Sequence, residues 1–330
     1  MSRVHTEPLP PPADPSGSLS RGTAKRDNLK NSAGSKRRFS PRARREGLVF
    51  LALVLPNLAL IGVFTYLPLL NNLYYSTLNW TLGSSNATVI GLGNYVTFFT
   101  SGDAPRVLGT TAVFTLITVG GSMVLGLLIA LALNQRIRGT TFARSAVFAP
   151  YVLSGVGVGL VWLFIFDPVY GVLAWFLRGF GATSPQWIND PDLALTMVII
   201  VYVWKNLGYC AVVYLAGLQS LPKDIMEASQ LDGAGAVRAF WSVKLPLISP
   251  TTFFLLITCL LSSLQAFDLI RIMTPLGSGT STLVYEAYLQ AFGAFNRAGY
   301  SAAISVILFT ILLVATVLQL RFVERKVHYS

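Results

Sequence analysis

Six long apolar segments, separated by polar stretches, dominate the pattern of this 330-residue chain. A helix of about 20 apolar residues is long enough to cross the hydrocarbon core of a bilayer. The pattern therefore predicts an all-α membrane protein with six transmembrane helices in residues 47–330. We place the helices at residues 48–70, 107–133, 143–166, 193–217, 252–273 and 301–322.

The composition supports a membrane protein without a soluble domain that could hydrolyse a nucleotide. The chain is 53% hydrophobic and only 12% charged, whereas soluble domains carry roughly 25% charged residues. The loops leave no room for a large soluble domain, and no GxxxxGK[ST] phosphate loop occurs. Cys210 and Cys259 fall inside spans and are interpreted as packing residues. We expect no catalytic residue, metal site or cofactor, and any ATP would be bound by partner subunits.

The net charge of +11 is distributed unevenly along the chain. If six helices alternate across the membrane, 20 Lys and Arg fall on one side, 11 of them before Leu48, and three fall on the other. The three are Arg106, Arg178 and Arg297. The positive-inside rule then places both termini and the polar loop that contains Glu227 in the cytoplasm of a multi-pass membrane protein. This distribution also argues against a nucleic acid as partner.

Residues 1–46 form a basic tail rich in Pro, Ser and Gly. Such a composition cannot bury a core, so we expect the tail to be disordered in the cytoplasm. It would either contact anionic membrane lipids or serve only to fix the topology.

The polar stretch at residues 222–246, between the fourth and fifth apolar segments, is internally organised. Pro222 can open a helix, because the first turn would leave its missing donor unpaired anyway. Gly233 lies where that helix would end with a positive φ. A second short helix, 237–244, would end at Pro246. We expect a helix, a glycine bend and a helix outside the bilayer, placed for another protein to dock on.

This stretch resembles the EAA loop of ABC importer permeases. That pattern is Glu-Ala-Ala, three residues, Gly, nine residues, Ile, one residue, Leu-Pro. Ser229 and Val243 depart from it by small changes of side chain. The resemblance implies a coupling loop to an ATPase, formed by Glu227, Ala228, Asp232, Gly233, Leu245 and Pro246.

The resemblance extends from about residue 45 to the C-terminus. Phe267-Asp268 and the GLGNY segment at 91–95 are similar to recurrent features of carbohydrate-type permeases. The segment 276–279 departs from the Gly-Gly-Pro that the family often has there. The segments 221–250 and 320–329 most resemble the first permease subunit of sn-glycerol-3-phosphate importers.

Charged residues inside membrane spans are costly, by about 2.5–3.5 kcal/mol each at a helix centre. Lys205, Asp268 and Arg271 lie well inside the predicted spans. They either line a polar cavity and contact a hydrophilic solute, or they are structural. In the structural interpretation Asp268 and Arg271 neutralise each other, and Lys205 pairs with a carbonyl or reaches the membrane interface. The other polar candidates for a substrate pathway are Asn206, Tyr209 and Gln265.

The resemblance implies a permease subunit of the bacterial plasma membrane that imports a small carbohydrate-related solute by alternating access. Its partners would be a second permease subunit, two ATP-binding subunits and an extracytoplasmic solute-binding protein. The solute would be sn-glycerol 3-phosphate or a glycerophosphodiester, or alternatively a neutral sugar or oligosaccharide. A secondary transporter and a membrane scaffold are the alternatives of another class.

Overall fold

The computed structural model describes residues 41–135, 139–233 and 235–323. The chain divides after Ile61 into two units, and each is described by itself. The first unit contains α1 (Pro41–Ile61). The second unit begins with η1 (Gly62–Tyr66), α2 (Leu67–Tyr75), β1 (Leu78–Asn79), β2 (Thr88–Val89), α3 (Gly93–Thr100), α4 (Asp103–Leu133), α5 (Thr140–Val152), α6 (Gly155–Phe166), α7 (Val172–Gly179) and α8 (Pro191–Gln219). It continues with α9 (Lys223–Leu231), α10 (Ala236–Ala239), η2 (Phe240–Lys244), α11 (Leu245–Leu247), α12 (Ser249–Leu264), α13 (Asp268–Met273), α14 (Leu283–Phe292), α15 (Ala298–Leu318) and η3 (Gln319–Val323).

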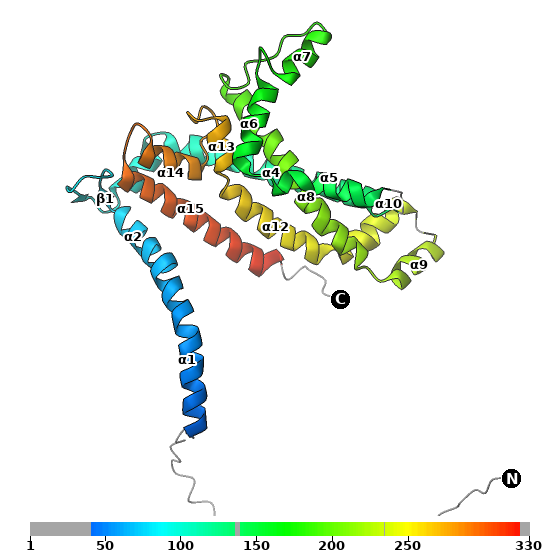
Figure 1. Ribbon diagram of the computed structural model, residues 1–330, viewed down its shortest axis with the longest axis horizontal. Coiled ribbons are helices and arrows are strands. Elements are labelled where there is room, and N and C mark those ends of the chain that lie inside the picture. Colours follow the sequence, from blue (N-terminus) through cyan, green and yellow to red (C-terminus); the bar gives the residue numbers. More distant parts are fainter. Residues whose placement is uncertain (1–40, 136–138, 234, 324–330) are drawn as a thin grey trace, which may run out of the picture. The chain divides into compact units, whose positions relative to one another are not determined.

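Four long helices, α4, α8, α12 and α15, organise the second unit (Figure 1). α4 packs along α8, α12 contacts both of them, and α15 contacts α12, α14, α2 and α3. α5 approaches α8 so closely at Gly208 that a Cβ there would collide with the carbonyl oxygen of Val147. Small residues permit such close helix approach in membrane proteins. β1 and β2 form a short antiparallel pair.

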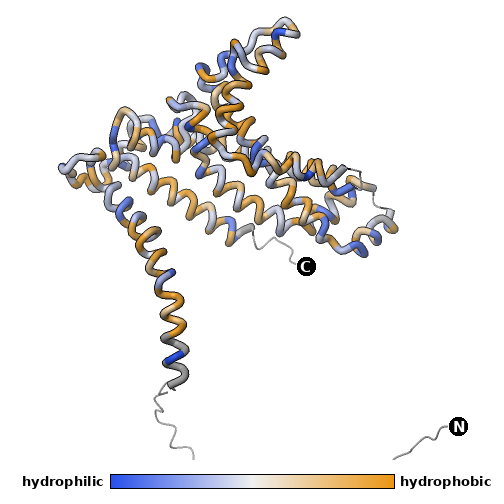
Figure 2. Tube along the Cα trace, viewed as in Figure 1, coloured by the Kyte–Doolittle hydropathy of each residue, from blue (hydrophilic) through white to orange (hydrophobic). Residues whose placement is uncertain are grey.

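The described residues contain five helices that are long and apolar enough to cross a membrane, or six if one bent pair counts as a span. The five are Val49–Tyr75, Asp103–Leu133, Pro191–Gln219, Ser249–Met273 and Ala298–Arg321. Figure 2 shows their apolar stretches in orange, with α9 largely hydrophilic. The prediction of an all-α membrane protein with about six spans is confirmed.

The third predicted span, however, is not one straight helix. It consists of α5 and α6, which are bent by 99° at a break between Val152 and Gly155. Leu153 and Ser154 have extended backbone conformations. Pro150 inside α5 cannot donate a backbone hydrogen bond, and this weakens the helix just before the break.

The fifth predicted span is also interrupted. α12 ends at Leu264, and α13 begins at Asp268 after an irregular connection in which Phe267 has φ −134° and ψ −61°. Neither Gly nor Pro occurs in that connection. The break therefore reflects tertiary packing rather than a local breaker.

Three clusters of buried apolar side chains hold these elements. The first joins α4, α6, α8, α13 and α14 around residues such as Phe114, Met197 and Ile270. The second joins α4, α8 and α12, and includes Cys210 and Cys259. The third joins α3, α4, α14 and α15. The first cluster fixes α6 of the third span and α13 of the fifth span against each other.

Candidate functional site

The segment from α9 to α11, residues 223–247, is called the α9 hairpin here. It connects α8 to α12 and lies at the opposite end of these helices from α14 (Figure 1). α9 and α10 contact each other across the bend. The expected order of helix, bend and helix is therefore present.

The bend of the hairpin depends on Gly233. Its φ is 75°, in the left-handed region that side chains with a Cβ rarely adopt. No atom lies within 4 Å of the position that a Cβ would occupy. The predicted positive φ is confirmed, and the need for glycine here comes from backbone conformation rather than from crowding.

The expected end of the second helix at Pro246 is wrong. The chain stays helical from Ala236 to Leu247 through the π-helical turn η2. Within that turn the Leu245 N–H donates to the Phe240 carbonyl, five residues earlier. Pro246 then occupies the first turn of α11, where a missing donor does no harm.

The hairpin exposes both charged and apolar side chains. Glu227, Ala228 and Asp232 are exposed. So are large apolar side chains, with Leu231 90% and Val237 73% accessible. The hairpin that joins the two spans therefore presents a mixed charged and apolar surface.

The breaks in the third and fifth spans lie side by side. A Cβ on Gly155, the first residue of α6, would be 3.3 Å from the Asp268 Cβ and 3.9 Å from Asp268 Oδ2. Asp268 is itself the first residue of α13. Its carboxylate thus lies near the N-terminal, positive end of α6 and at that of its own helix.

Lys205 lies beside the break in the third span, at the C-terminal end of α5. Its Nζ donates to the carbonyl oxygen of Tyr151 at 2.8 Å and lies 5.4 Å from the Tyr151 ring centre. Tyr151 is in the last turn of α5, whose final carbonyls have no partner within the helix. The ammonium group therefore caps the negative end of α5. This contact agrees with the structural interpretation of Lys205, while two of its N–H donors remain available to a solute.

Tyr209 and Asn206 lie close to Lys205 on α8. The Tyr209 ring stacks on the Tyr151 ring at 4.9 Å and 19°, and its hydroxyl lies 3.5 Å from Thr258 Oγ1. Asn206 Nδ2 donates to the Tyr202 carbonyl within the helix at 2.8 Å. Both residues line a cavity of about 10 Å³, which has room for one water molecule. The structure thus brings together the three candidates from the fourth span.

The three candidates from the fifth span form a second group. Gln265, Asp268 and Arg271 are all exposed and follow one another at intervals of three residues. The Arg271 Cζ lies 4.8 Å from the Tyr288 ring centre and 5.9 Å from that of Phe267. Within the described residues, no ion pair joins Asp268 to Arg271. The expected mutual neutralisation of Asp268 and Arg271 is therefore absent.

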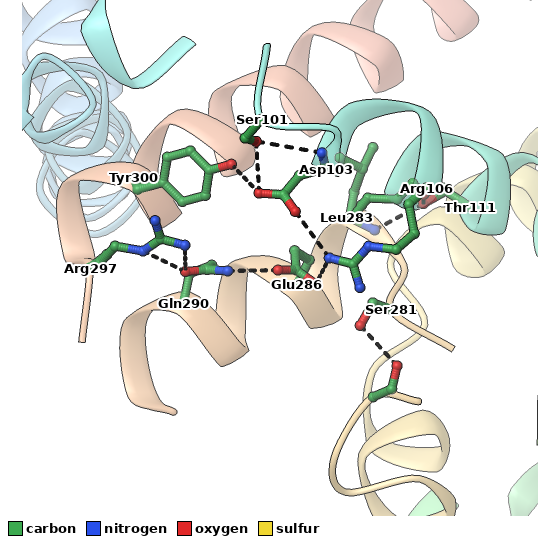
Figure 3. Close-up of polar contacts among 12 residues, drawn as sticks. Ser101, Asp103, Arg106, Thr111, Ser281, Leu283, Glu286, Gln290, Arg297 and Tyr300 are labelled. Atoms are coloured by element: carbon green, nitrogen blue, oxygen red, sulfur yellow. Dashed lines mark hydrogen bonds and ion pairs between the residues drawn. The ribbon is translucent and has the colours of Figure 1, made fainter. Parts of the chain in front are cut away.

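A cluster of polar residues at the start of α4 escaped the sequence analysis. The Asp103 carboxylate accepts from the Tyr300 hydroxyl at 2.9 Å and pairs with Arg106 at 3.2 Å (Figure 3). Arg106 also lies 3.8 Å from the buried carboxylate of Glu286 on α14. The cluster ties the beginning of α4 to α14 and α15.

The same cluster continues along α14. Gln290 Nε2 donates to Glu286 Oε1 at 2.7 Å, and Gln290 Oε1 accepts from Arg297 Nε and Nη2 at 2.9 and 2.7 Å (Figure 3). Glu286 was missed because only charges inside the six apolar segments were considered. The signal that could have found it is the amphipathic spacing of residues 283–292, with Glu286 and Gln290 four positions apart on one face.

Tyr285 shows how the opposite side of α14 is held. Its hydroxyl lies within hydrogen-bonding distance of the carbonyl oxygens of Pro275 at 2.7 Å and Thr274 at 3.0 Å. Burial raises the pKa of the Tyr285 phenol, so the group stays a neutral donor. Among the described residues, no three His, Cys, Asp or Glu side chains meet in a group that could hold a metal ion.

Comparison with known proteins gives a consistent result. Residues 122–328 match the family described as the binding-protein-dependent transport system inner membrane component. The sn-glycerol-3-phosphate transport system permease protein UgpA of Agrobacterium fabrum is 36% identical over 281 residues, covering 84% of this chain and 95% of that protein. The multiple sugar-binding transport system permease protein MsmF of Streptococcus mutans is 37% identical over 276 residues, covering 83% and 94%.

A solved structure supports the fold independently. A chain of a bacterial ABC transporter involved in the import of the acidic polysaccharide alginate matches with a TM-score of 0.75 and 22% identity. The match covers 86% of this chain and 97% of that one. The chain described here therefore belongs to the family of inner-membrane components of binding-protein-dependent transport systems, and it is a multi-pass permease subunit of an ABC importer rather than an enzyme.

Proposed function

We propose that this chain is the first permease subunit of an importer for sn-glycerol 3-phosphate or a glycerophosphodiester. The relatives named for sn-glycerol 3-phosphate are 34–36% identical to this chain, and each alignment covers 95% of the relative. They support a carbohydrate-related solute in general and a phosphorylated polyol in particular. Since the chain belongs to the ABC importers, the secondary-transporter and scaffold alternatives are wrong.

One structural observation supports the proposal most directly. Gln265, Asp268 and Arg271 present an exposed polar face on an apolar bundle. A guanidinium group exposed to lipid is costly, so this face is suited to a water-filled pathway. Arg271 offers a planar set of donors that fits phosphate oxygens two at a time.

We infer a pathway that passes both polar groups described above. Arg271, Asp268 and Gln265 would lie toward one end, and Lys205, Asn206 and Tyr209 would lie further along. The adjoining helix breaks support this placement, since irregular backbone inside a membrane is tolerated where it is buried in protein or lines a cavity. Lys205 would serve both as the cap of α5 and as a wall of the pathway.

The α9 hairpin is proposed as the coupling element. Glu227 and Asp232 would make charged contacts with an ATP-binding subunit, while Gly233, Leu245 and Pro246 would fix the shape of the hairpin around Ala228. Closure of the ATPase pair would move the hairpin, and α8 and α12, which it joins, would transmit that motion to the spans. ATP would be bound only by the partner subunits.

The proposed assembly contains this chain, a second permease subunit, two ATP-binding subunits and an extracytoplasmic solute-binding protein. The polar face at Gln265, Asp268 and Arg271 is exposed in the isolated subunit, so the second permease would close the pathway from the other side. Membrane lipids would surround the apolar outer surfaces of the spans.

A neutral sugar or oligosaccharide is the second candidate solute. The relative MsmF, whose name refers to multiple sugars, supports it. So does the stacked pair Tyr151 and Tyr209, because an aromatic surface beside polar groups suits a sugar ring without any charge.

Transport by the reconstituted assembly tests the proposal. Vesicles would contain both permease subunits and the ATP-binding subunits, with the binding protein on the outer side and ATP inside. We expect labelled sn-glycerol 3-phosphate to accumulate only with ATP, and an excess of a neutral disaccharide to leave its uptake unchanged. ATP-dependent uptake of the disaccharide without uptake of the phosphate would favour the second candidate.

A further inference from the structure

A cavity between α6, α13 and α14 has a composition suited to an anionic carbohydrate. Its volume is about 550 Å³, and it is lined by Arg271, Tyr285, Tyr288 and Phe292 among others. Cavities of this size hold small organic ligands, usually with aromatic walls and a few polar groups that fix orientation. Here the cavity offers three aromatic side chains and one guanidinium group.

Arg271 is the charged group of this cavity. In the part of the chain that the structure describes, its guanidinium has no hydrogen bond and no carboxylate within salt-bridge distance, and it rests on the Tyr288 ring. Five N–H donors of an arginine are therefore available on one wall. Stacking on the ring limits the freedom of the guanidinium, so less entropy is lost when it binds an anion.

The aromatic wall comes from one face of α14. Tyr285, Tyr288 and Phe292 follow one another at helical spacing, and Phe267 packs edge-on against Tyr288 at 4.9 Å. Tyr285 and Tyr288 are nearly parallel, with an angle of 10° and centres 6.2 Å apart. Flat apolar surfaces arranged in this way can cover the carbon-bound face of a sugar or polyol.

The opposite face of α14 holds this wall in place. Glu286 and Gln290, 4% and 3% accessible, connect α14 to Arg106 on α4 and to Arg297 before α15 (Figure 3). Buried polar groups that are fully paired define one arrangement, because any other would leave them unpaired. The aromatic wall is therefore positioned before any ligand arrives.

We propose that this cavity is a binding subsite for a carbohydrate-related solute with an anionic group, at the end of the bundle opposite the α9 hairpin. Arg271 binds the phosphate or carboxylate, and Tyr288 and Phe292 contact the carbon skeleton. The inference rests on the proposed function and deepens it, since it locates recognition of the anion at Arg271 and leaves Lys205 mainly as a helix cap. Glu286 and Gln290 act as positioning residues.

Equilibrium binding to the complete transporter in lipid nanodiscs tests the subsite, without ATP or binding protein. The probes are sn-glycerol 3-phosphate, inorganic phosphate and glycerol. We expect Arg271→Gln to weaken binding of sn-glycerol 3-phosphate at least 10-fold and Arg271→Lys to weaken it less, because lysine keeps the charge but not the planar donors. Tyr288→Leu should weaken binding of the polyol phosphate more than that of inorganic phosphate.

Arg178→Gln is the matched control. Arg178 lies on α7 outside the cavity, with its side chain bonded to the carbonyls of Ala174 and Val169, so its removal changes the net charge equally. Binding should be unchanged in this variant. Subunit abundance and a melting curve are measured for each variant to detect a folding defect. If Arg271→Gln folds poorly, the affinity of Arg271→Lys is compared with that of the wild type instead.

The outcomes separate the two proposals. If the wild-type transporter takes up sn-glycerol 3-phosphate in vesicles but Arg271→Gln binds it with wild-type affinity, the subsite is wrong and the proposed function stands. If the wild type neither binds nor transports it, both proposals are wrong. Nanodiscs of phosphatidylcholine alone are compared with discs that contain phosphatidylglycerol. Equal affinity in both supports a solute site, whereas a 10-fold loss with the anionic lipid would assign the cavity to lipid headgroups.

Discussion

At the scale of single residues, two of the three charges inside the spans lie where the backbone itself provides a charge of opposite sign. Lys205 contacts a C-terminal carbonyl of α5, and Asp268 lies near the first residue of α6. A helix end carries roughly half an elementary charge, negative at the C-terminus and positive at the N-terminus. The broken span thus explains how both charges can lie within membrane-spanning segments, whatever they also do for a solute.

Replacing Lys205 tests this role. Lys205→Met nearly keeps the length of the side chain and removes the donor, so it should lower stability by at most about 1.5–3 kcal/mol, the range for a hydrogen bond that involves a charged group. Lys205→Gln keeps a donor and should cost less. Subunit abundance and the melting temperature in detergent measure the effect. If both variants fold normally and only uptake of sn-glycerol 3-phosphate falls, Lys205 is a solute contact rather than a cap.

At the scale of elements, much of the helical architecture follows from the sequence. Long apolar runs predict α4, α8 and α15 within a few residues, since a spanning helix must satisfy its backbone internally. Pro222 and Gly233 likewise indicate the hairpin. In each of these cases the element is determined by residues close together in the sequence or by contact with the membrane, and both can be read from the sequence.

The interrupted spans and the buried cluster on α14 could not be predicted in the same way. No Gly or Pro marks the break before α13, which depends on packing against α6 and α8. Glu286 lies in a helix too short to span the membrane, and its partners are Arg106, 180 residues earlier, and Gln290. The contact with Arg106 leaves no local pattern, and the spacing of Glu286 and Gln290 indicates a shared helix face but not that this face is buried. For the same reason, the sequence indicated Arg271 but not the aromatic side chains of α14 around it.

The α9 hairpin yields a prediction at this scale. Gly233→Val would force a β-branched residue into a positive φ, at a cost of about 1–3 kcal/mol, and should change the angle between α9 and α10. Insertion should persist, because a Cβ at this position meets no other atom within 4 Å. We expect ATP-driven uptake to fall severalfold at normal abundance. Basal ATP hydrolysis that no longer responds to loaded binding protein would show that coupling is lost.

Gly235→Ala is the matched control, since Gly235 has an extended conformation that alanine can adopt. Its uptake should stay close to that of the wild type. Full uptake in both Gly233→Val and Glu227→Lys would contradict the docking role of the hairpin.

At the scale of the whole molecule, charge and fold point to the same orientation. The α9 hairpin and α14 lie at opposite ends of the bundle. Lys223, Arg238 and Lys244 are in the hairpin, whereas Arg106 and Arg297 are beside α14. The larger group of 20 basic residues includes the tail before Leu48 and the C-terminal end. The positive-inside rule therefore predicts that the hairpin and both termini are cytoplasmic and that α14 faces outward.

Cysteine labelling in intact cells checks this orientation. Thr183→Cys lies in the exposed connection between α7 and α8, and Ser330→Cys is the last residue of the chain. We expect a membrane-impermeant maleimide to label Thr183→Cys in intact cells and Ser330→Cys only after the membrane is disrupted. The native Cys210 and Cys259 are free but buried, so the wild type should give little background.

Labelling of Ser330→Cys in intact cells would contradict the cytoplasmic C-terminus, and would move the proposed anion subsite to the cytoplasmic side. Labelling at both positions would mean an even number of spans between them, so that one of the three segments after Thr183, such as α12 with α13, does not cross the membrane.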